Sequence, residues 1–571
     1  MREVVTVQVG GFANFIGSHF WNFQDELLGL AGEPDSDPVF KNNGLNMDVL
    51  YRSGETQEGV LTYTPRLVSV NYQGTLGSMS SNGTLYSQPP ESPPPVATWK
   101  GSLSVQRSQH QKRNLFLQRL HEEEQIPSSG VENGHTLSPH DNQDKSIVES
   151  LENDVHFWTD FSKVHYHPQS LYELSGLWMD VEQFNSYGAG KDVFAESLGG
   201  EEMNDRLRFF LEECDHIQGI QFLVDDSGGF SSVAENFLVN VADEYSNTPV
   251  MLYTVRDPRS QMSSRSQKRN ISRDLHDAVS FARLSPLCKL VVPVGLPSLS
   301  EVSTYLRVND GKQYHCSAVY AAALHSLSLP FRMDLPGPSA ISSCTYGALD
   351  VNGIVQTLSG QLRQNTVIML DATMPAPCLT GSGKVAEEPI LRNLQCLTPD
   401  VSEALEDSQS VETLVINGAF QSGGNRATVS EVQQAISAAY GHSIPRPRFC
   451  HLSVAACPLP IPLPFPSIFS DNVSQSGQLL GSPTPNSLSK GSLDVHSIPM
   501  AARLRSSHDV LPFLSNRVDN LRKYGIRRGA LGGELLSSWG FGREEVEDMA
   551  ETLSNLVKVL DPFSDGSSDS D

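Results

Sequence analysis

Two glycine-containing loops are the segments of this chain best suited to phosphate chemistry. In the first, Gly10 and Gly11 directly follow a β-branched apolar run at 4–9 and precede a helical pattern at 15–30. Glycine lets a backbone approach an anion closely, and the first turn of a helix offers unpaired amides and the positive end of its dipole. This order predicts either a phosphate loop or a plain tight turn between a strand and a helix.

The second loop, SGGFSS at 227–232, lies between an apolar run and another helical pattern, and two aspartates stand directly before it. The bulk of Phe230 and the negative charge of the aspartates both oppose the binding of a triphosphate. Ser232 and Glu235 have the spacing of a capping box, in which each side chain bonds a backbone amide of the other. We therefore expect that this loop can serve only to start a helix.

Other catalytic patterns have little support. His165 and His167 have strand spacing and would point the same way, as paired metal ligands do, but no cysteine or carboxylate spacing completes a metal site. The chain has no G-x-S-x-G, H-E-x-x-H or G-K-[ST] motif. Its eight cysteines include no C-x-x-C pair, which suits reduced thiols rather than zinc. We expect no catalytic residue and no metal. The QSGGN loop at 421–425 is interpreted as a turn before a helix capped by Thr428 and Glu431.

The charge balance is strongly acidic, with 41 Lys and Arg against 66 Asp and Glu, a formal net charge of −25. This argues against nucleic-acid binding and against attraction to anionic membranes, and it favours basic protein partners. The start has neither a secretory core nor a basic transit helix, and no apolar stretch reaches the roughly 18 residues of a membrane span. We expect a cytoplasmic chain with only peripheral membrane association. The basic run at 256–273 is predicted to be a solvated loop, with docking onto an acidic partner as the alternative.

The elements that must position these loops follow an alternating pattern. Strands are expected near 220–224, 249–254, 288–293 and 366–371, with helical runs between them. Strands that alternate with helices predict a mostly parallel sheet covered on both faces. A chain of 571 residues exceeds the size of one core, so at least two domains are expected.

Several blocks of the chain resemble tubulin. The first 21 residues, MREVVTVQVGGFANFIGSHFW, are similar to its amino terminus, and 43–76 resembles the hairpin that leads through Tyr-x-Pro-Arg into its second strand. Residues 205–245 are similar to its helix, strand, glycine-rich signature loop and helix, and the segment at 156–174 resembles the misato branch most closely. The chain is identified as a member of the misato branch of the tubulin superfamily. This resemblance implies a tubulin-like α/β fold, with a mostly parallel nucleotide-type domain, a second α/β domain and C-terminal helices.

The resemblance and the composition together divide the chain. The expected order is a tubulin-like block at 1–76, a disordered insertion at 77–150, the rest of the nucleotide-type domain at 151–328, a second, intermediate-like domain at 329–456, a Pro- and Ser-rich linker at 457–498, and C-terminal helices with an acidic tail at 499–571. The first insert contains QPPESPPP and few core formers, and the second contains CPLPIPLPFP, which favours extended polyproline structure. We expect that deleting 77–150 leaves the stability nearly unchanged.

What remains of a nucleotide site is implied by the resemblance. The residues that stand at the family's nucleotide-binding positions, whether or not the residue type is kept, are Gly10, Gly11, Asn14, Ser227, Gly228, Gly229 and Ser231. Several positions depart from the family pattern: Gly11 replaces a Gln that contacts nucleotide and magnesium, and Asn71 and Gln73 stand where acidic residues lie near the magnesium ion. Val355 aligns with the acid that activates hydrolysis. A site so poor in carboxylates holds Mg²⁺ weakly. We therefore expect no cofactor, at most weak GTP binding, and no enzymatic activity.

The misato resemblance also implies a role in mitochondrial distribution, morphology and fusion, at the cytosolic face of the mitochondrial outer membrane. Its expected partners are proteins: outer-membrane factors, tubulin or the cytosolic chaperonin. Two alternatives remain open. One is a divergent tubulin homologue that still binds GTP or polymerises, and the other is a cytoskeletal assembly or chaperone cofactor with a role in spindle and chromosome segregation.

Overall fold

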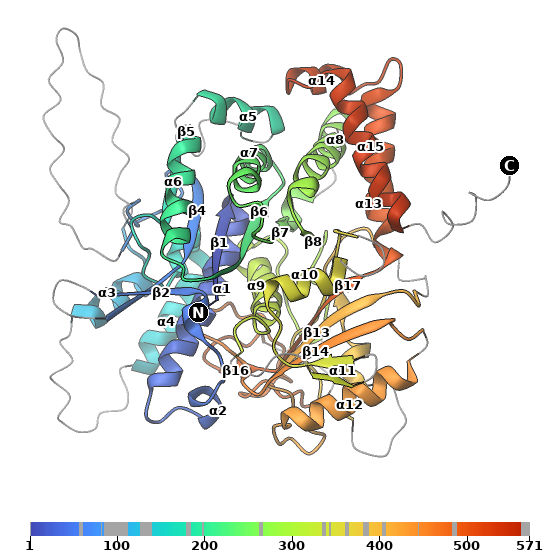
Figure 1. The fold of residues 1–571 in the computed structure, drawn as a ribbon. Helices are drawn as coiled ribbons and strands as arrows, with labels where there is room; N and C mark the ends of the chain where they lie inside the picture. Colours follow the sequence, from blue (N-terminus) through green and yellow to red (C-terminus); the bar gives the residue numbers. More distant parts are fainter. Residues whose placement is uncertain are drawn as a thin grey trace, which may run out of the picture.

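Two large sheets, the helices that cover them and a set of C-terminal helices make up most of the described chain, as the computed structural model shows (Figure 1). The structure describes residues 2–55, 61–81, 83–84, 112–125, 140–178, 184, 186–196, 199–261, 266–333, 339–341, 344–359, 365–380, 388–401, 407–443, 445–481 and 488–560. Among these, no helix is long and apolar enough to cross a membrane.

The first sheet has six strands in the order β5-β4-β1-β6-β7-β8, and every neighbouring pair is parallel. The strands are β1 (Glu3–Val9), β4 (Leu67–Gln73), β5 (Leu171–Trp178), β6 (Ile217–Asp225), β7 (Val250–Val255) and β8 (Leu290–Val294). Parallel strands in such a sheet bury both faces, and β1, β7 and β8 are accordingly buried along their whole length. The predicted parallel sheet and three of its predicted strands are confirmed.

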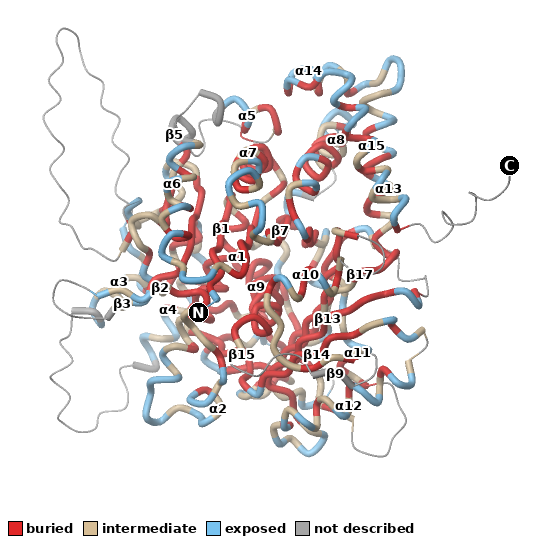
Figure 2. The backbone as a smooth tube through the Cα atoms, viewed as in Figure 1, coloured by how far each residue is buried: buried red, intermediate tan, exposed pale blue. Residues whose placement is uncertain are grey.

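Helices cover both faces of this sheet. On one face, α1 (Gly11–Gly32) and α9 (Gln313–Ser328) share a core with Leu223 and Met251. On the other face, the core contains Val7 and Phe222 together with side chains of α6 (Gly199–Glu212), α7 (Phe230–Glu244) and α8 (Gln267–Leu284). Figure 2 shows β1, α1 and α9 as mostly buried backbone. A hairpin of β2 (Tyr51–Glu55) and β3 (Leu61–Pro65) and the short helix α2 (Pro38–Lys41) complete the N-terminal block.

The second sheet is mixed and has the order β12-β11-β17-β13-β14-β10-β9. Its strands are β9 (Ser339–Ile341), β10 (Cys344–Tyr346), β11 (Met369–Thr373), β12 (Gln395–Cys396), β13 (Val411–Asn417), β14 (Phe449–Ala455) and β17 (Met500–Ser506). Helix α12 (Val429–His442) packs on one face, whereas α9 and α10 (Val351–Ser359) lie on the other. The capping box of Thr428 and Glu431 is confirmed at the start of α12. A four-residue helix, α11 (Pro389–Arg392), precedes β12.

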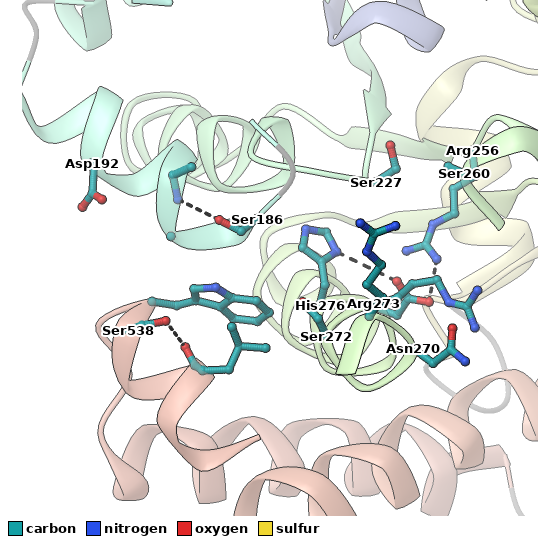
Figure 3. A pocket seen from close by; sticks show the side chains of 16 residues that line it. Ser186, Asp192, Ser227, Arg256, Ser260, Asn270, Ser272, Arg273, His276 and Ser538 are labelled. Atoms are coloured by element: carbon teal, nitrogen blue, oxygen red, sulfur yellow. Dashed lines mark hydrogen bonds and ion pairs between the residues drawn. The ribbon is translucent and has the colours of Figure 1, made fainter. Parts of the chain in front are cut away.

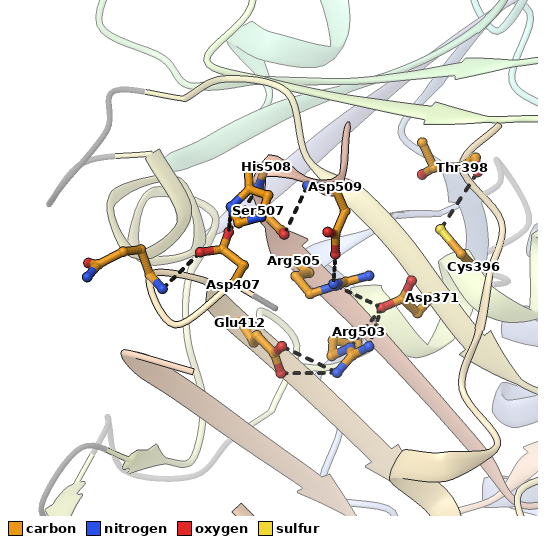
Figure 4. Close-up of polar contacts among 11 residues, drawn as sticks. Asp371, Cys396, Thr398, Asp407, Glu412, Arg503, Arg505, Ser507, His508 and Asp509 are labelled. Atoms are coloured by element: carbon orange, nitrogen blue, oxygen red, sulfur yellow. Dashed lines mark hydrogen bonds and ion pairs between the residues drawn. The ribbon is translucent and has the colours of Figure 1, made fainter. Parts of the chain in front are cut away.

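Strand β17 belongs to this sheet, although the sequence placed it with the C-terminal helices. Ion pairs hold it there (Figure 4): Arg503 Nη2 lies 2.6 Å from Asp371 Oδ2, and Arg503 Nη1 lies 3.3 Å from Glu412 Oε2. Arg505 pairs with Asp509, just beyond the end of the strand. Asp371 lies opposite Arg503 in the strand register and also pairs with it by charge, whereas Glu412 lies opposite Arg505 and pairs diagonally with Arg503.

The predicted disorder of 77–150 is wrong for the helices that it contains. Helices α3 (Leu115–Gln125) and α4 (His140–Asp154) insert Phe116, Ile147 and Leu151 into the main core, each at most 3% exposed. An ion pair between Arg119 and Asp144 joins the two helices. A few apolar residues at helical spacing are enough to bury one face of a short helix when a larger core is adjacent. Residues 85–111 and 126–139 lie outside the described residues.

The predicted linker at 457–498 is also wrong. Its apolar side chains fill the space beside α1 and α9; Leu459, Phe465, Phe469, Val473 and Val495 are all at most 1% exposed. The segment begins and ends in paired strands, β15 (Leu459–Pro460) and β16 (Ser497–Ile498). Proline gives it an extended backbone, but the large apolar residues between the prolines pack as a core. Residues 482–487 fall in a gap of the described chain.

The C-terminal helices pack on the first domain. Helix α13 (Leu511–Leu521) contacts α8, where the rings of Phe281 and Phe513 lie 5.1 Å apart, and Figure 1 shows the red helices beside α8. Helix α15 (Arg543–Leu560) buries its predicted apolar face, and α14 (Gly533–Ser538) connects it to the bundle. The predicted acidic tail at 561–571 lies outside the described residues.

Candidate functional site

Both glycine loops lie at the carboxyl ends of the adjacent strands β1 and β6, so the structure brings the predicted site residues together. Gly10 has a φ of 106°, in the left-handed region that favours glycine. A Cβ atom at Gly10 would lie 2.7 Å from the Cβ of Asp225 and 3.1 Å from the ring of Phe230. The glycine therefore makes room for two protein side chains. At Gly11, in contrast, a Cβ atom would meet no atom within 4 Å.

The carboxylate of Asp225 lies against the first turn of α1, in the place of an anion. Its Oδ2 accepts a hydrogen bond from the Phe12 amide at 3.2 Å. Its Oδ1 accepts one from the Ser227 hydroxyl at 2.5 Å and one from the Ser227 amide at 3.2 Å. Burial raises the pKa of Asp225, and the hydrogen bonds from Ser227 and Phe12 oppose that rise. The positive end of the helix dipole is thus already compensated by an internal negative group.

Three aromatic rings, from Tyr72, Phe184 and Phe230, fill the space between the loops, and we refer to them as the aromatic plug. The ring of Phe230 lies 4.6 Å from that of Tyr72 and 5.1 Å from that of Phe184. Phe230 is only 5% exposed. A Cβ atom at Gly229 would lie 2.7 Å from the Phe184 ring. The second glycine loop therefore also makes room for aromatic rings.

The polar groups of the second loop bond to the protein itself. The Gly229 amide donates to the Phe184 carbonyl at 3.1 Å, and the Ser231 hydroxyl donates to the Gly228 carbonyl at 2.8 Å. The Nε2 atom of His276 lies 3.1 Å from the same Gly228 carbonyl and 3.2 Å from the Ser231 hydroxyl. Sequence reasoning missed His276, because it lies on α8 and nothing in its local pattern connects it to the loop.

The predicted capping box of Ser232 and Glu235 is wrong. Helix α7 begins at Phe230, with Gly229 as its N-cap, so Ser232 already lies inside the first turn. Glu235 instead accepts hydrogen bonds from the Tyr187 hydroxyl and from Arg283. The glutamate therefore joins α7 to α5 (Tyr187–Glu196) and α8 rather than capping its own helix.

Asn14 is fully buried and takes part in an internal polar network. Its Nδ2 donates to the Val70 carbonyl at 3.1 Å and to Asn71 Oδ1 at 2.8 Å, and its Oδ1 accepts from the Ser69 hydroxyl at 2.9 Å. Trp158 Nε1 also donates to Asn71 Oδ1, at 2.9 Å. These contacts fix α1 to β4, where the resemblance implied nucleotide and magnesium contacts.

A polar cleft of about 870 Å³ opens beside the second loop, between α5, α8 and α14 (Figure 3). The predicted solvated basic run at 256–273 contributes to it, but Arg256 is 9% exposed rather than solvated. Arg256 Nε lies 2.5 Å from Asp226 Oδ1, and Arg256 Nη1 lies 2.7 Å from Asp277 Oδ2. Residues 262–265 of this run are not among the described ones.

The histidines considered as metal ligands have other surroundings. The ring of His167 stacks on that of Phe209 at 4.8 Å, and burial, followed by the charge of Arg52, lowers the pKa of His167 to about 4. Within the described ranges, no group of three or more His, Cys, Asp or Glu side chains could hold a metal ion. Val355, at the position of the hydrolytic acid, packs into the core from α10.

Comparison with known proteins agrees with this architecture. The Misato Segment II tubulin-like domain family matches residues 2–122, and the Tubulin domain family matches residues 148–333. The chain is 30% identical to the mouse protein misato homolog 1 and 29% identical to the human protein, with 99% of each chain covered. It is 28% identical to the Drosophila melanogaster protein misato, again over 99% of both chains. The chain therefore belongs to the misato family of tubulin-like proteins.

Proposed function

We propose that this chain is a non-enzymatic, tubulin-like protein that acts in mitochondrial distribution, morphology and fusion. One observation carries the non-enzymatic part: the aromatic plug and the Asp225 carboxylate occupy the space and the helix terminus that a triphosphate would need. The mitochondrial part rests on membership of the misato family and on the role that its resemblance implies.

Binding of GTP in its usual place would require two costly changes. The phosphates would have to displace or neutralise Asp225, because two anions cannot share the same first-turn amides. They would also have to expel at least Phe230, whose buried ring pairs with both other members of the plug. Neither Asn71 nor Gln73 supplies the carboxylate that usually helps to hold Mg²⁺ beside the phosphates.

The nucleotide part is tested on the purified full-length protein. We expect no GTP or GDP in the perchloric-acid extract, no saturable binding of labelled GTP with Mg²⁺, and no phosphate release above that of a blank. Tight, magnesium-dependent GTP binding with turnover would overturn the proposal and favour the divergent GTPase alternative.

The cellular part is tested by depletion and rescue with a charge placed in the first loop. A side chain at Gly11 meets no atom, and an aspartate in the first turn of α1 is favourable, so Gly11→Asp should fold while repelling any phosphate. We expect wild type and Gly11→Asp to restore the mitochondrial network equally. The matched negative control is Val7→Asp, which places an unpaired charge in a fully buried strand. A folded Gly11→Asp protein that fails to rescue would overturn the nucleotide-independent role, and an unaltered network after depletion would overturn the mitochondrial role.

We further propose that any mitochondrial fraction is held by a protein partner on the cytosolic face of the outer membrane. Carbonate should extract this fraction, and protease added to intact mitochondria should digest it. Affinity purification distinguishes the partners, because recovery of outer-membrane fusion factors supports this proposal. Recovery of tubulin or chaperonin subunits alone would favour the chaperone alternative. Resistance to both carbonate and protease would contradict the peripheral location.

A further inference from the structure

The polar cleft between α5, α8 and α14 is lined by three arginines, and we name it the arginine cleft. The arginines are Arg256, Arg269 and Arg273, and the lining also includes Ser227 of the second glycine loop. Apart from Ser227, the lining includes no predicted nucleotide-site residue and no member of the aromatic plug, so the cleft is a different space from the filled space between the two glycine loops. We propose that the arginine cleft binds a small molecule that carries a phosphate group next to an apolar or aromatic body.

Arg256 is the centre of the cationic side of this cleft. Asp226 and Asp277 hold its Nε and Nη1 atoms, which fixes the plane of the guanidinium. Its Nη2 atom is buried and has no hydrogen-bond partner among the residues that the structure describes, and the residue as a whole is 9% exposed. A buried guanidinium N–H without an acceptor is costly, and Arg256 is one of the residues that line the cleft. An oriented donor that lacks its acceptor is the feature that a bound anion would explain.

Two further arginines extend the same side. Arg269 and Arg273 lie one turn apart on α8, so their side chains share a face of the helix. Figure 3 shows Arg273, Arg256, Ser260 and Asn270 on one side of the cleft and Asp192 on the other. Asp277, the other acidic residue of the lining, is already paired with Arg256. The positive groups thus gather at one end, where hydroxyl and amide donors accompany them.

This set of donors suits phosphate better than other anions. Planar guanidinium groups bind phosphate oxygens bidentately, and a phosphate offers several acceptor oxygens to converging donors. The cleft is far larger than one phosphate, since its volume of about 870 Å³ falls in the range of small-molecule pockets. Leu535 and Trp539 of the α14 region supply an apolar wall for the rest of the ligand.

The test is calorimetric titration of the full-length protein with phenyl phosphate, which carries both parts of the predicted ligand. We expect saturable binding in the micromolar to low millimolar range, and binding of inorganic phosphate that is about tenfold weaker because it lacks the ring. Arg269→Gln and Arg273→Gln should each weaken phenyl phosphate binding at least about tenfold, the size expected for loss of one charge-assisted contact. The matched control is Lys268→Gln, which removes an exposed cation from the same helix outside the lining, and should change the affinity less than twofold.

Arg256 is probed with Arg256→Lys, because a neutral residue would leave Asp226 and Asp277 without their cation. The lysine keeps the charge but cannot present the forked donors, so binding should weaken while the melting temperature stays close to that of wild type. The proposal is overturned if phenyl phosphate shows no saturable binding at millimolar concentration, or if the three arginine variants bind it as wild type does. It is also overturned if a glutamate-rich peptide binds with the same arginine dependence and phenyl phosphate does not displace it, because the cleft would then be an acidic-peptide site.

Discussion

Truncation of Phe230 to alanine tests whether the nucleotide space is truly a packed core. The ring is 5% exposed and makes contacts with Tyr72 at 4.6 Å and Phe184 at 5.1 Å. Removal of a buried phenylalanine side chain costs about 3 to 5 kcal/mol, and each aromatic pair adds about 0.5 to 1.5 kcal/mol beyond burial. Gly10 and Gly229 form part of the wall and have no side chains that could refill the cavity. We therefore expect a loss near the upper end of that range, about 4 to 5 kcal/mol.

Urea unfolding followed by tryptophan fluorescence measures this loss, with GTP binding measured on the same samples. Phe230→Leu is the matched control: it keeps most of the apolar volume and should cost only about 1 to 1.5 kcal/mol. Neither variant should gain GTP binding, because Asp225 still occupies the first turn of α1. A loss below about 1 kcal/mol for Phe230→Ala would show that the ring is not packed as described. Tight GTP binding by the alanine variant would show that the plug alone, and not the carboxylate, excludes nucleotide.

Three further outcomes follow from other contacts. Leu151→Asp in α4 should cost several kcal/mol by placing a charge in the core, measured by thermal unfolding, whereas an unchanged melting temperature would restore the disordered interpretation of 77–150. Burial raises the pKa of Glu152, but its bonds with His315, the Ser467 amide and Lys312 outweigh that and lower it from 4.5 to about 2. Its contribution, at most about 3 kcal/mol, is complete above pH 4.5 and is lost as the pH falls towards 2, so urea titrations of Glu152→Gln should show a weaker acid dependence than wild type. Thr428→Ala removes one half of the capping box of α12 and should cost about 1 kcal/mol in the same assay.

The sequence was sufficient where local pattern decides the structure. Runs of β-branched residues such as 4–9 and 250–255 become strands that are buried along their whole length, as is typical of a parallel sheet covered on both faces by helices. The capping box at Thr428 could be predicted because the side chains of Thr428 and Glu431 each accept a hydrogen bond from the backbone amide of the other, without any distant partner. The same spacing at Ser232 and Glu235 does not form a capping box, because α7 already begins at Phe230.

The predictions for 77–150 and 457–498, which were expected to be unpacked, were wrong for a different reason. In neither segment does the composition alone determine how deeply the side chains are buried. The segment at 457–498 is rich in proline, but Phe465 and Phe469 pack against each other at 5.6 Å, and Phe465 also packs against Phe23 of α1 at 5.9 Å. Helix α4 is polar on most of its surface, yet it buries Ile147 and Leu151 in the main core. Whether such residues are buried depends on a surface supplied by another part of the chain, which no local window contains.

Only part of the candidate site could be predicted from the sequence. The charge and bulk beside the second loop indicated that a triphosphate would be opposed, but not that Asp225 reaches the first turn of α1 or that Phe184 closes the space above Gly229. These contacts matter because they satisfy the groups that would otherwise call for a ligand. A helix terminus with unpaired amides and an open glycine loop gain free energy when an anion binds. Under the proposed function, the carboxylate and the rings replace that gain within the folded chain, so the domain would keep the architecture of a nucleotide-binding protein without depending on nucleotide for its stability.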